Sequence, residues 1–292
     1  MRLRQSIQLS MLIGAALILA VPPVAQTEPN EDDRFIREQL GSLNGDDQAR
    51  ALSRLIWSED DSLPASPSVA ANARQRLLGW GKRGMPIMRE AMDWAHPRYS
   101  ADIVSCVIEA EKSMKSGRSH ATNSTIDAAI WFGSTDGKRI AMVHYGLRPH
   151  LGSMLPIIDT AYDHPQLRLL VIESLRSLRN DKARFFLAEV LESGSAEERL
   201  RSAEAMAHIG GRCLEYLRGW SLSDDAELRS IAMSALLPVA NIADLTTLYE
   251  YIGLYPDEDP KLLARLVTRA QDLEAAFEAQ QEIDSASPAL DD

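Results

Sequence analysis

Among the side chains that could do acid–base or metal chemistry are six histidines, and they form no recognisable pattern. No histidine is adjacent to a glutamate, and His144 and His150 are six residues apart, a spacing that does not place two ligands on one helix face. We therefore interpret the histidines as isolated or hydrogen-bonded residues. Neither a metal nor any other cofactor is expected. The six residues are His96, His120, His144, His150, His164 and His208.

Patterns for nucleophilic or phosphate chemistry are equally lacking. "GKRG" at 81–84 and "DGKR" at 136–139 do not have the glycine frame and Lys-Ser/Thr pair of a phosphate-binding loop. Cys106 and Cys213 fall among apolar residues on expected helices several repeats apart, which favours two buried free thiols over a disulfide or a reactive thiol. No catalytic residue is expected, and the chain is not predicted to be an enzyme.

The most regularly spaced charged residue is an arginine in the second half of the chain. Arg168, Arg199 and Arg229 are 31 and 30 residues apart. A period of about 30 residues indicates stacked helical units rather than one closed core. A stripe of three arginines could hold an acidic partner, but we favour a structural role in which each arginine bridges to a neighbouring unit. Apolar positions seven residues later keep the same spacing, at Leu175, Met206 and Leu236.

These segments resemble HEAT-like repeats, in the short bacterial form that also occurs in phycobilin-lyase-type proteins. The residues that resemble the family are "LRLLVIESLRSLRND" from Leu167, "ERLRSAEAMAHIGG" from Glu198 and "LRSIAMSALLPVAN" from Leu228, with weaker copies at 69–92 and 139–162. The resemblance implies an all-α fold, an α-solenoid of stacked antiparallel helix pairs. It also implies a protein that binds partners and has no catalytic residues common to the family.

Capping residues mark where the helices of these repeats begin. Ser195 with Glu198, and Asp224 with Glu227, have the spacing of capping boxes, in which each side chain accepts a hydrogen bond from the other residue's backbone. We therefore expect helices to start after Ser195 and Asp224.

Aromatic residues on the second helix of each repeat are the predicted partner-binding residues. These helices are expected at about 182–192, 212–222 and 242–252. In HEAT-like arrays the second helices line the concave face, and exposed Tyr and Trp residues are frequent binding hot spots. Packing between repeats is the competing explanation. The predicted residues are Tyr216, Trp220, Tyr249 and Tyr251, with Glu189 and Glu250 adding negative charge nearby.

The composition suits a helical protein with an acidic surface. Hydrophobic residues make up 45% of the chain and aromatic residues only 6%, as close-packed helices allow. The formal net charge of −11 at pH 7 repels phosphate backbones, so no nucleic-acid partner is expected. A basic protein partner fits this charge better, although an acidic surface that only keeps the protein in solution is the simpler interpretation.

Residues 1–25 are predicted to be a secretory signal peptide. Arg2 and Arg4 precede an apolar run from Met11 to Val21, which is shorter than the roughly 20 residues needed to span a bilayer. The protein is therefore expected to be exported, to the periplasm or the extracellular space. An uncleaved signal that anchors the protein in the inner membrane is the alternative.

The rest of the chain divides into four parts, one of which contains an interruption. Residues 95–138 break the repeat pattern with an expected helix at Ser100–Met114, a polar loop at 115–124, a helix after Ser124 and a turn at 133–139. Such insertions often lie on the binding side of an array, whereas an eroded repeat is the simpler interpretation. The four parts are a linker at 26–33, irregular helical repeats with this insertion at 34–138, regular HEAT-like repeats with a C-terminal capping helix at 139–283, and a disordered tail at 284–292.

The sequence thus predicts an exported scaffold of HEAT-like repeats that mediates protein–protein interaction. One alternative is a HEAT-like lyase or other repeat-based enzyme with its site at the 95–138 insertion, and another is a membrane-associated scaffold held by its signal. A polar cleft that gathers His120, Asp136 and His144 would favour the enzyme. An open aromatic groove would favour binding.

Overall fold

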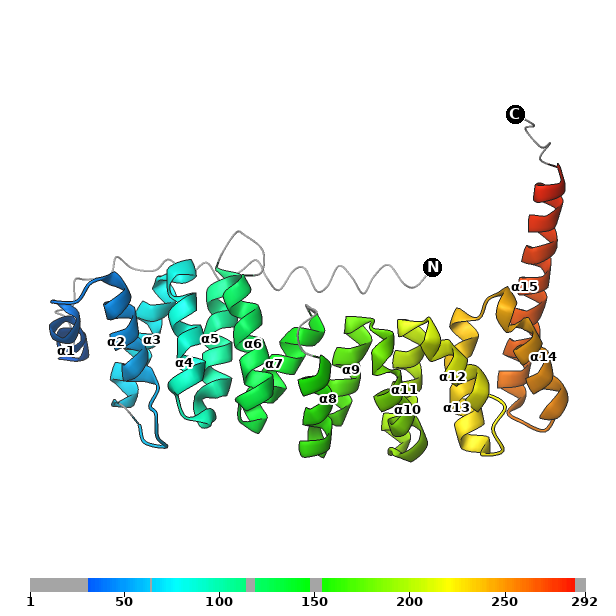
Figure 1. Ribbon diagram of the computed structural model, residues 1–292, viewed down its shortest axis with the longest axis horizontal. Coiled ribbons are helices and arrows are strands. Elements are labelled where there is room, and N and C mark those ends of the chain that lie inside the picture. The colour runs from blue at the N-terminus through cyan, green and yellow to red at the C-terminus, as the bar shows by residue number, and fades with distance from the viewer. Residues whose placement is uncertain (1–30, 64, 114–118, 148–153, 287–292) are drawn as a thin grey trace, which may run out of the picture.

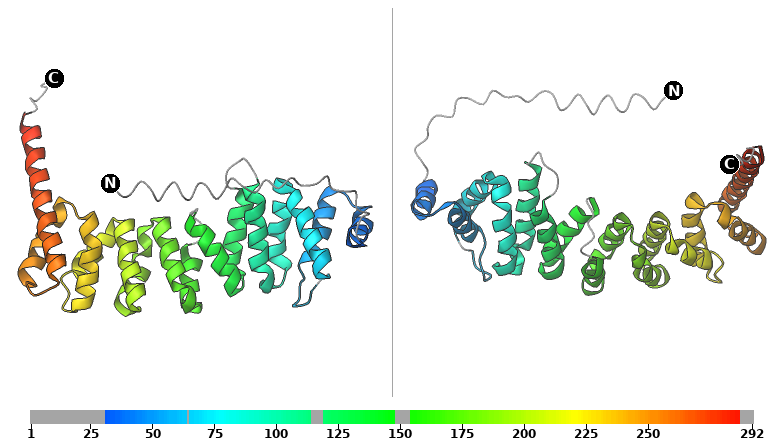
Figure 2. Two further views of the ribbon diagram at one scale, coloured as in Figure 1. Left: turned by 180° about the vertical axis from the view of Figure 1, so that it is seen from behind. Right: turned by 45° about the horizontal axis from the view of Figure 1, so that its top comes forward.

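The computed structural model describes residues 31–63, 65–113, 119–147 and 154–286, and within these ranges the chain contains helices and no strand. The helices stand in one elongated row, with α1 at one end and α15 at the other (Figure 1). Figure 2 shows that the row is bent rather than straight. The predicted all-α, solenoid-like fold is confirmed. The predicted signal at 1–25 lies outside the described residues.

The described ranges contain fifteen α-helices, and several of the connections between them include 3₁₀ segments. The first eight are α1 (Glu31–Leu40), α2 (Gly45–Ile56), α3 (Pro67–Gly79), α4 (Met85–Trp94), α5 (Ser100–Lys112), α6 (His120–Phe132), α7 (Thr135–Leu147) and α8 (Met154–Asp163). The others are α9 (Arg168–Leu178), α10 (Arg184–Ser193), α11 (Ala196–Ile209), α12 (Arg212–Trp220), α13 (Ala226–Leu236), α14 (Leu245–Leu254) and α15 (Pro260–Ala286).

Odd-numbered and even-numbered helices form two layers. The odd layer is continuous from α1 to α13, because each odd helix from α1 to α11 packs against the next odd helix. The even layer runs from α2 to α14. From α6 onward its successive helices contact one another only sparsely, although each packs well against the odd helix beside it. The even helices of the C-terminal half are therefore spaced more widely than the odd helices, and large side chains must fill the spaces between them.

Buried apolar residues form three clusters along the row instead of one central core. The clusters extend from Ile36 to Ala110, from Val104 to Leu236 and from Met233 to Ala270. The expected division between residues 138 and 139 falls inside α7, in a region where the second cluster is continuous.

Arginines at the repeat register join each helix pair to the next, as the structural interpretation predicted. The partner is in every case a carboxylate of the following unit rather than of the preceding turn. Arg229 is only 8% exposed, and its guanidinium also stacks on the ring of Tyr255 at 3.8 Å. We call these contacts the arginine ladder: Arg168 Nη1 to Glu198 Oε1 at 3.4 Å, Arg199 Nη1 to Glu227 Oε2 at 2.7 Å, and Arg229 Nη2 to Glu258 Oε1 at 2.5 Å.

One of the two predicted capping boxes is present. The backbone N–H of Ser195 donates to the Glu198 carboxylate at 2.8 Å, and the backbone N–H of Glu198 donates to the Ser195 hydroxyl at 3.4 Å. The predicted box of Asp224 with Glu227 is wrong. Asp225 is the N-cap of α13, and its side chain accepts the backbone N–H of Glu227 at 3.0 Å. Asp224 and Asp225 are adjacent and either could cap the helix, so the sequence did not distinguish between them.

The described residues between 95 and 138 include α5, α6 and the start of α7, which pack in the row like the other helices. This agrees with the eroded-repeat interpretation, and α5 nearly matches the helix expected at Ser100–Met114. The expected loop at 115–124 is wrong in its second half, because α6 already begins at His120. Ser119 is the N-cap of α6 and accepts the backbone N–H of Thr122 at 3.1 Å.

The turn expected at 133–139 is also wrong, because α7 begins two residues into this stretch. Gly137, which looked like a turn residue, is a helical contact residue: a Cβ at this position would clash with Ser100 of α5. Lys138 is buried, and its Nζ donates to the carbonyl of Ile130 at 2.7 Å, so it caps the end of α6. Burial lowers the pKa of Lys138.

The last helix is longer than the others and leaves the row. Leu262, Leu266 and Ala270 of α15 are buried in the C-terminal cluster, whereas residues 275–282 are exposed. Figure 1 shows this second half rising away from the other helices. The helix continues to Ala286, which is beyond the expected end at residue 283. Within the described ranges, no helix has both the length and the apolar character needed to cross a membrane.

Replacing Arg229 with glutamine is expected to lower the free energy of unfolding by about 2 kcal/mol, because Glu258 would lose a charged and partly buried partner. Arg201 provides a matched control, since its pair with Glu204 is an exposed i,i+3 contact. Arg201→Gln should change the same quantity by less than about 0.5 kcal/mol. Urea denaturation followed by far-UV circular dichroism measures both. Equal effects would contradict the stabilising role of the ladder.

Both cysteines are buried free thiols, as predicted. Burial raises the pKa of Cys106 to about 12 and that of Cys213 to about 11. Both thiols are therefore protonated near pH 8, about the ordinary pKa of cysteine. We expect neither to react with dithiobis(nitrobenzoate) in the folded protein at that pH, and both to react in concentrated guanidinium chloride. Rapid release of thionitrobenzoate from the folded protein would contradict this environment.

Candidate functional site

Most exposed aromatic side chains of the described residues lie on the even layer. Trp131 and Phe132 end α6, Tyr162 lies in the last turn of α8, Phe185 is in the first turn of α10 and Tyr249 lies in α14. Their exposed fractions range from 44% for Tyr249 to 73% for Phe132. Large apolar side chains that line up on one face mark a surface for binding more often than isolated ones do.

Aromatic rings bridge the wide spaces between α8, α10 and α12. Tyr162 and Phe186 meet edge to face with centroids 5.8 Å apart, and Phe185 and Tyr216 do so at 6.5 Å. Trp220 lies against Tyr216 at 5.4 Å. The rings fill space that shorter side chains would leave empty, and Tyr162 and Phe185 remain at least half exposed. We call Tyr162, Phe185, Tyr216 and Trp220 the aromatic ridge.

A surface cavity of about 430 Å³ lies beside the ridge, between α10 and α12. Tyr216 and Trp220 form its aromatic wall, and Glu192 and Glu215 supply two carboxylates. Neither carboxylate makes a hydrogen bond or ion pair with any residue that the structure describes. Negative charge next to the faces of aromatic rings attracts organic cations. The cavity therefore suits a guanidinium or an ammonium group.

The even layer already places guanidinium groups of its own on aromatic rings. The Arg184 guanidinium lies 4.3 Å from the centre of the Phe185 ring, and the Arg54 guanidinium lies 5.3 Å from the centre of the Trp94 ring. In the same layer, the Tyr162 hydroxyl donates to a carboxylate oxygen of Glu189 at 2.7 Å. Burial and this hydrogen bond raise the pKa of Tyr162 to about 12, so the hydroxyl stays a donor.

A second cavity with similar chemistry lies at the other end of the row. Its volume is also about 430 Å³, and it is bounded by the end of α4, the turn before α5 and the end of α6. Carboxylates and aromatic rings line it together, as they do between α10 and α12. The residues concerned are Glu59, Asp93, Trp94, His96 and Phe132.

Three of the four predicted binding residues reach the surface. Tyr216 and Trp220 are partly buried in the ridge, and Tyr249 is 44% exposed. A hydrogen bond with Glu274 raises the pKa of Tyr249. Tyr251 has no exposed surface and packs against Tyr255 with centroids 5.3 Å apart. Tyr251 is therefore a core residue and is not part of this surface.

Adjacent aromatic residues were the sequence signal that could have identified the missing part of this surface. Neighbouring residues on a helix point about 100° apart, so a pair such as Phe185-Phe186 can place one ring in the core and the other at the surface. Phe186 is 4% exposed and Phe185 is 61% exposed. Trp131 and Phe132 form another such pair at the end of α6, with centroids 6.2 Å apart.

The residues required by the enzyme alternative do not form one cleft. Asp136 is in the first turn of α7 and pairs with Arg139 at 2.7 Å, whereas His144 is eight residues further, about 12 Å along the helix axis. His144 is buried, with Nε2 3.7 Å from the Glu111 carboxylate of α5, a contact that the sequence did not suggest. His120 is exposed at the start of α6. No three His, Cys, Asp or Glu side chains of the described ranges are grouped closely enough to hold a metal ion.

Neither protein families nor curated proteins suggest a role for this surface. No model of a protein family matches the chain, and no curated protein is significantly similar to it. A function for the even layer must therefore be derived from its own residues.

Proposed function

We propose that this chain is a non-enzymatic scaffold of HEAT-like repeats that binds a protein partner through its even layer. The observation that supports this most is the aromatic ridge beside Glu192 and Glu215, two carboxylates that have no partner among the described residues. Tyr and Trp are enriched among interface hot spots because they offer a large, stiff apolar area with a polar edge. The long row of helices extends this surface well beyond a single pocket.

The partner's contact segment is basic and also contains apolar residues. An arginine or lysine in the α10–α12 cavity would meet a carboxylate and an aromatic face together, and the ring contact alone contributes about 0.5–1 kcal/mol at an exposed site. Glu250 extends the negative charge to α14, where it is exposed beside Tyr249. Apolar side chains of the partner would cover the Phe185 ring. Nucleic acid is not proposed as a partner, because its phosphates would be repelled by these carboxylates.

Selection of a random peptide library on the folded protein is expected to enrich sequences that combine Arg or Lys with aliphatic or aromatic residues. Phe185→Ala should weaken the selected peptides by about tenfold or more, since it removes an exposed anchor of the ridge. Phe277→Ala is the matched control, because Phe277 is also an exposed aromatic but lies on α15. Fluorescence anisotropy with a labelled peptide measures both affinities.

A third variant separates binding from stability. Tyr251→Ala should cost about 3–5 kcal/mol of stability and leave the affinity per folded molecule unchanged, since Tyr251 is buried. Enrichment of acidic peptides, or equal affinities for Phe185→Ala and Phe277→Ala, would rule out the even layer as a surface for a basic partner.

We further propose that the scaffold is exported, with residues 1–25 acting as its signal. The supporting observation is the short apolar run after two arginines in the sequence. N-terminal sequencing of the protein purified from its source should find a chain that begins near residue 26 outside the cytoplasm. A chain that begins at Met1 in the membrane fraction would indicate the anchored alternative. A soluble cytosolic chain that begins at Met1 would contradict export in either form.

A further inference from the structure

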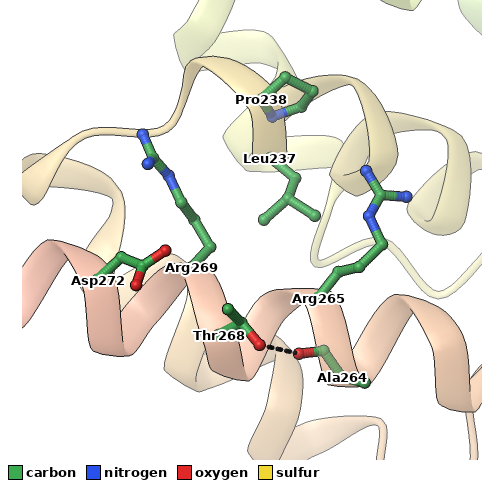
Figure 3. A pocket seen from close by; sticks show the side chains of 7 residues that line it. All are labelled: Leu237, Pro238, Ala264, Arg265, Thr268, Arg269 and Asp272. Carbon is green, nitrogen blue, oxygen red and sulfur yellow. Dashed lines mark hydrogen bonds between the residues drawn. The ribbon is translucent and has the colours of Figure 1, made fainter. Parts of the chain in front are cut away.

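A cavity of about 450 Å³ lies between α15 and the 3₁₀ segment Leu237–Val239 that follows α13. Figure 3 shows the guanidinium groups of Arg265 and Arg269 on either side of Leu237 and Pro238, with Asp272 next to Arg269. The two arginines are one helical turn apart and both border the same space. The cavity thus has two cationic walls around an apolar floor.

The arginines of this cavity differ from those of the arginine ladder. Each ladder arginine meets a carboxylate of the next unit, whereas Arg265 is exposed and makes no hydrogen bond or ion pair with a described residue. Arg269 donates from Nη2 to the carbonyl oxygen of Ala240 at 2.5 Å. Its Nε is buried and has no hydrogen-bond partner among the described residues. A guanidinium is always charged, so an unused buried donor of this kind is suited to an anionic acceptor.

The remaining lining restricts which anion fits. Asp272 contributes one negative charge, which repels a doubly charged phosphate more than a singly charged carboxylate. Leu237 and Pro238 provide an apolar contact next to the two guanidinium groups. Arginine also matches a carboxylate geometrically, because its N–H groups can donate to both carboxylate oxygens. A carboxylate with an apolar group beside it therefore fits the cavity best.

We propose that this cavity binds a carboxylate of a partner peptide that carries an aliphatic side chain next to it. Arg265 and the Nε of Arg269 donate to the carboxylate, and the aliphatic group lies on Leu237 and Pro238. The carboxylate belongs either to an Asp or Glu side chain or to the C-terminus of the partner. The site is on α15, away from the aromatic ridge, and it does not depend on the function proposed for the even layer.

The test uses three acetylated peptides and the full chain in isothermal titration calorimetry. The first ends in Ala-Leu-Asp with an amidated C-terminus, the second ends in Ala-Leu with a free C-terminal carboxylate, and the third ends in Ala-Leu with an amidated C-terminus. At least one carboxylate peptide is expected to bind about tenfold or more tightly than the third, and its affinity should fall as salt is added. The first two peptides distinguish a side-chain carboxylate from a terminal one.

Three variants assign the effect to the cavity. Arg265→Gln is expected to reduce the affinity about fivefold or more with an unchanged melting temperature, since Arg265 pairs with no described residue. Arg269→Lys keeps the positive charge and removes Nε, and it should also weaken binding. Arg212→Gln is the matched control, because Arg212 is an exposed arginine of α12 outside the cavity.

Four results would overturn the proposal. These are equal binding of all three peptides, tighter binding of inorganic phosphate than of either carboxylate peptide, full affinity in Arg265→Gln, and equal loss in Arg212→Gln. Phe185→Ala should leave this binding unchanged. Failure at the aromatic ridge and failure at the arginine cavity are therefore distinguishable.

Discussion

No helix pair in this chain can enclose its own apolar residues, so each pair depends on a neighbour to cover them. The odd layer meets this need with small residues that let its helices approach closely. The Ser174 hydroxyl on α9 donates to the backbone carbonyl of Met142 on α7 at 3.3 Å, and Ala205 on α11 has no exposed surface. Gly137 has the same role where α7 meets α5. Close approach on this side sets the continuous core, and the arginine ladder adds a charged contact from each regular unit to the next.

The wide helix spacing of the even layer is the consequence of the close approach of the odd helices. When one side of a row is tight and the other is wide, the wide side needs large side chains, and in this chain they are aromatic. Rings that bridge two helices cannot be covered on every side, so Phe185 and Tyr162 remain half exposed or more. The features that stabilise the even layer and the features that could hold a partner are therefore the same residues. This overlap explains why packing and binding were competing explanations for Tyr216 and Trp220 in the sequence.

The repeat period was sufficient to predict the fold class, and the apolar residues that keep this period, Leu175, Met206 and Leu236, are all fully buried. It also indicated that the arginines bridge between units. Glycine and polar residues were less reliable signals of loops and turns between residues 115 and 139. Gly137, for example, allows a close contact between two helices and does not form a turn. The position of each aromatic residue around its helix determined whether it belongs to the candidate site. Tyr249 and Tyr251 are two residues apart, which is about 200° around the helix, so they point to opposite sides, and only Tyr249 is exposed. The wide spacing of the even helices is a tertiary property, and no local pattern encodes the cavities that it creates.

The arginine ladder gives the row a direction. The units that begin with α11 and α13 each offer a guanidinium to the unit that follows and a carboxylate to the unit that precedes, so the contact is head-to-tail. A head-to-tail contact that does not close on itself builds an open filament when it is repeated between molecules. The long helix α15 interrupts this series: it buries Leu262 and Leu266 against the row and turns exposed residues such as Lys261 and Arg265 outward. Among the described residues, the ladder therefore ends at the contact of Arg229 with Glu258, just before α15 begins at Pro260.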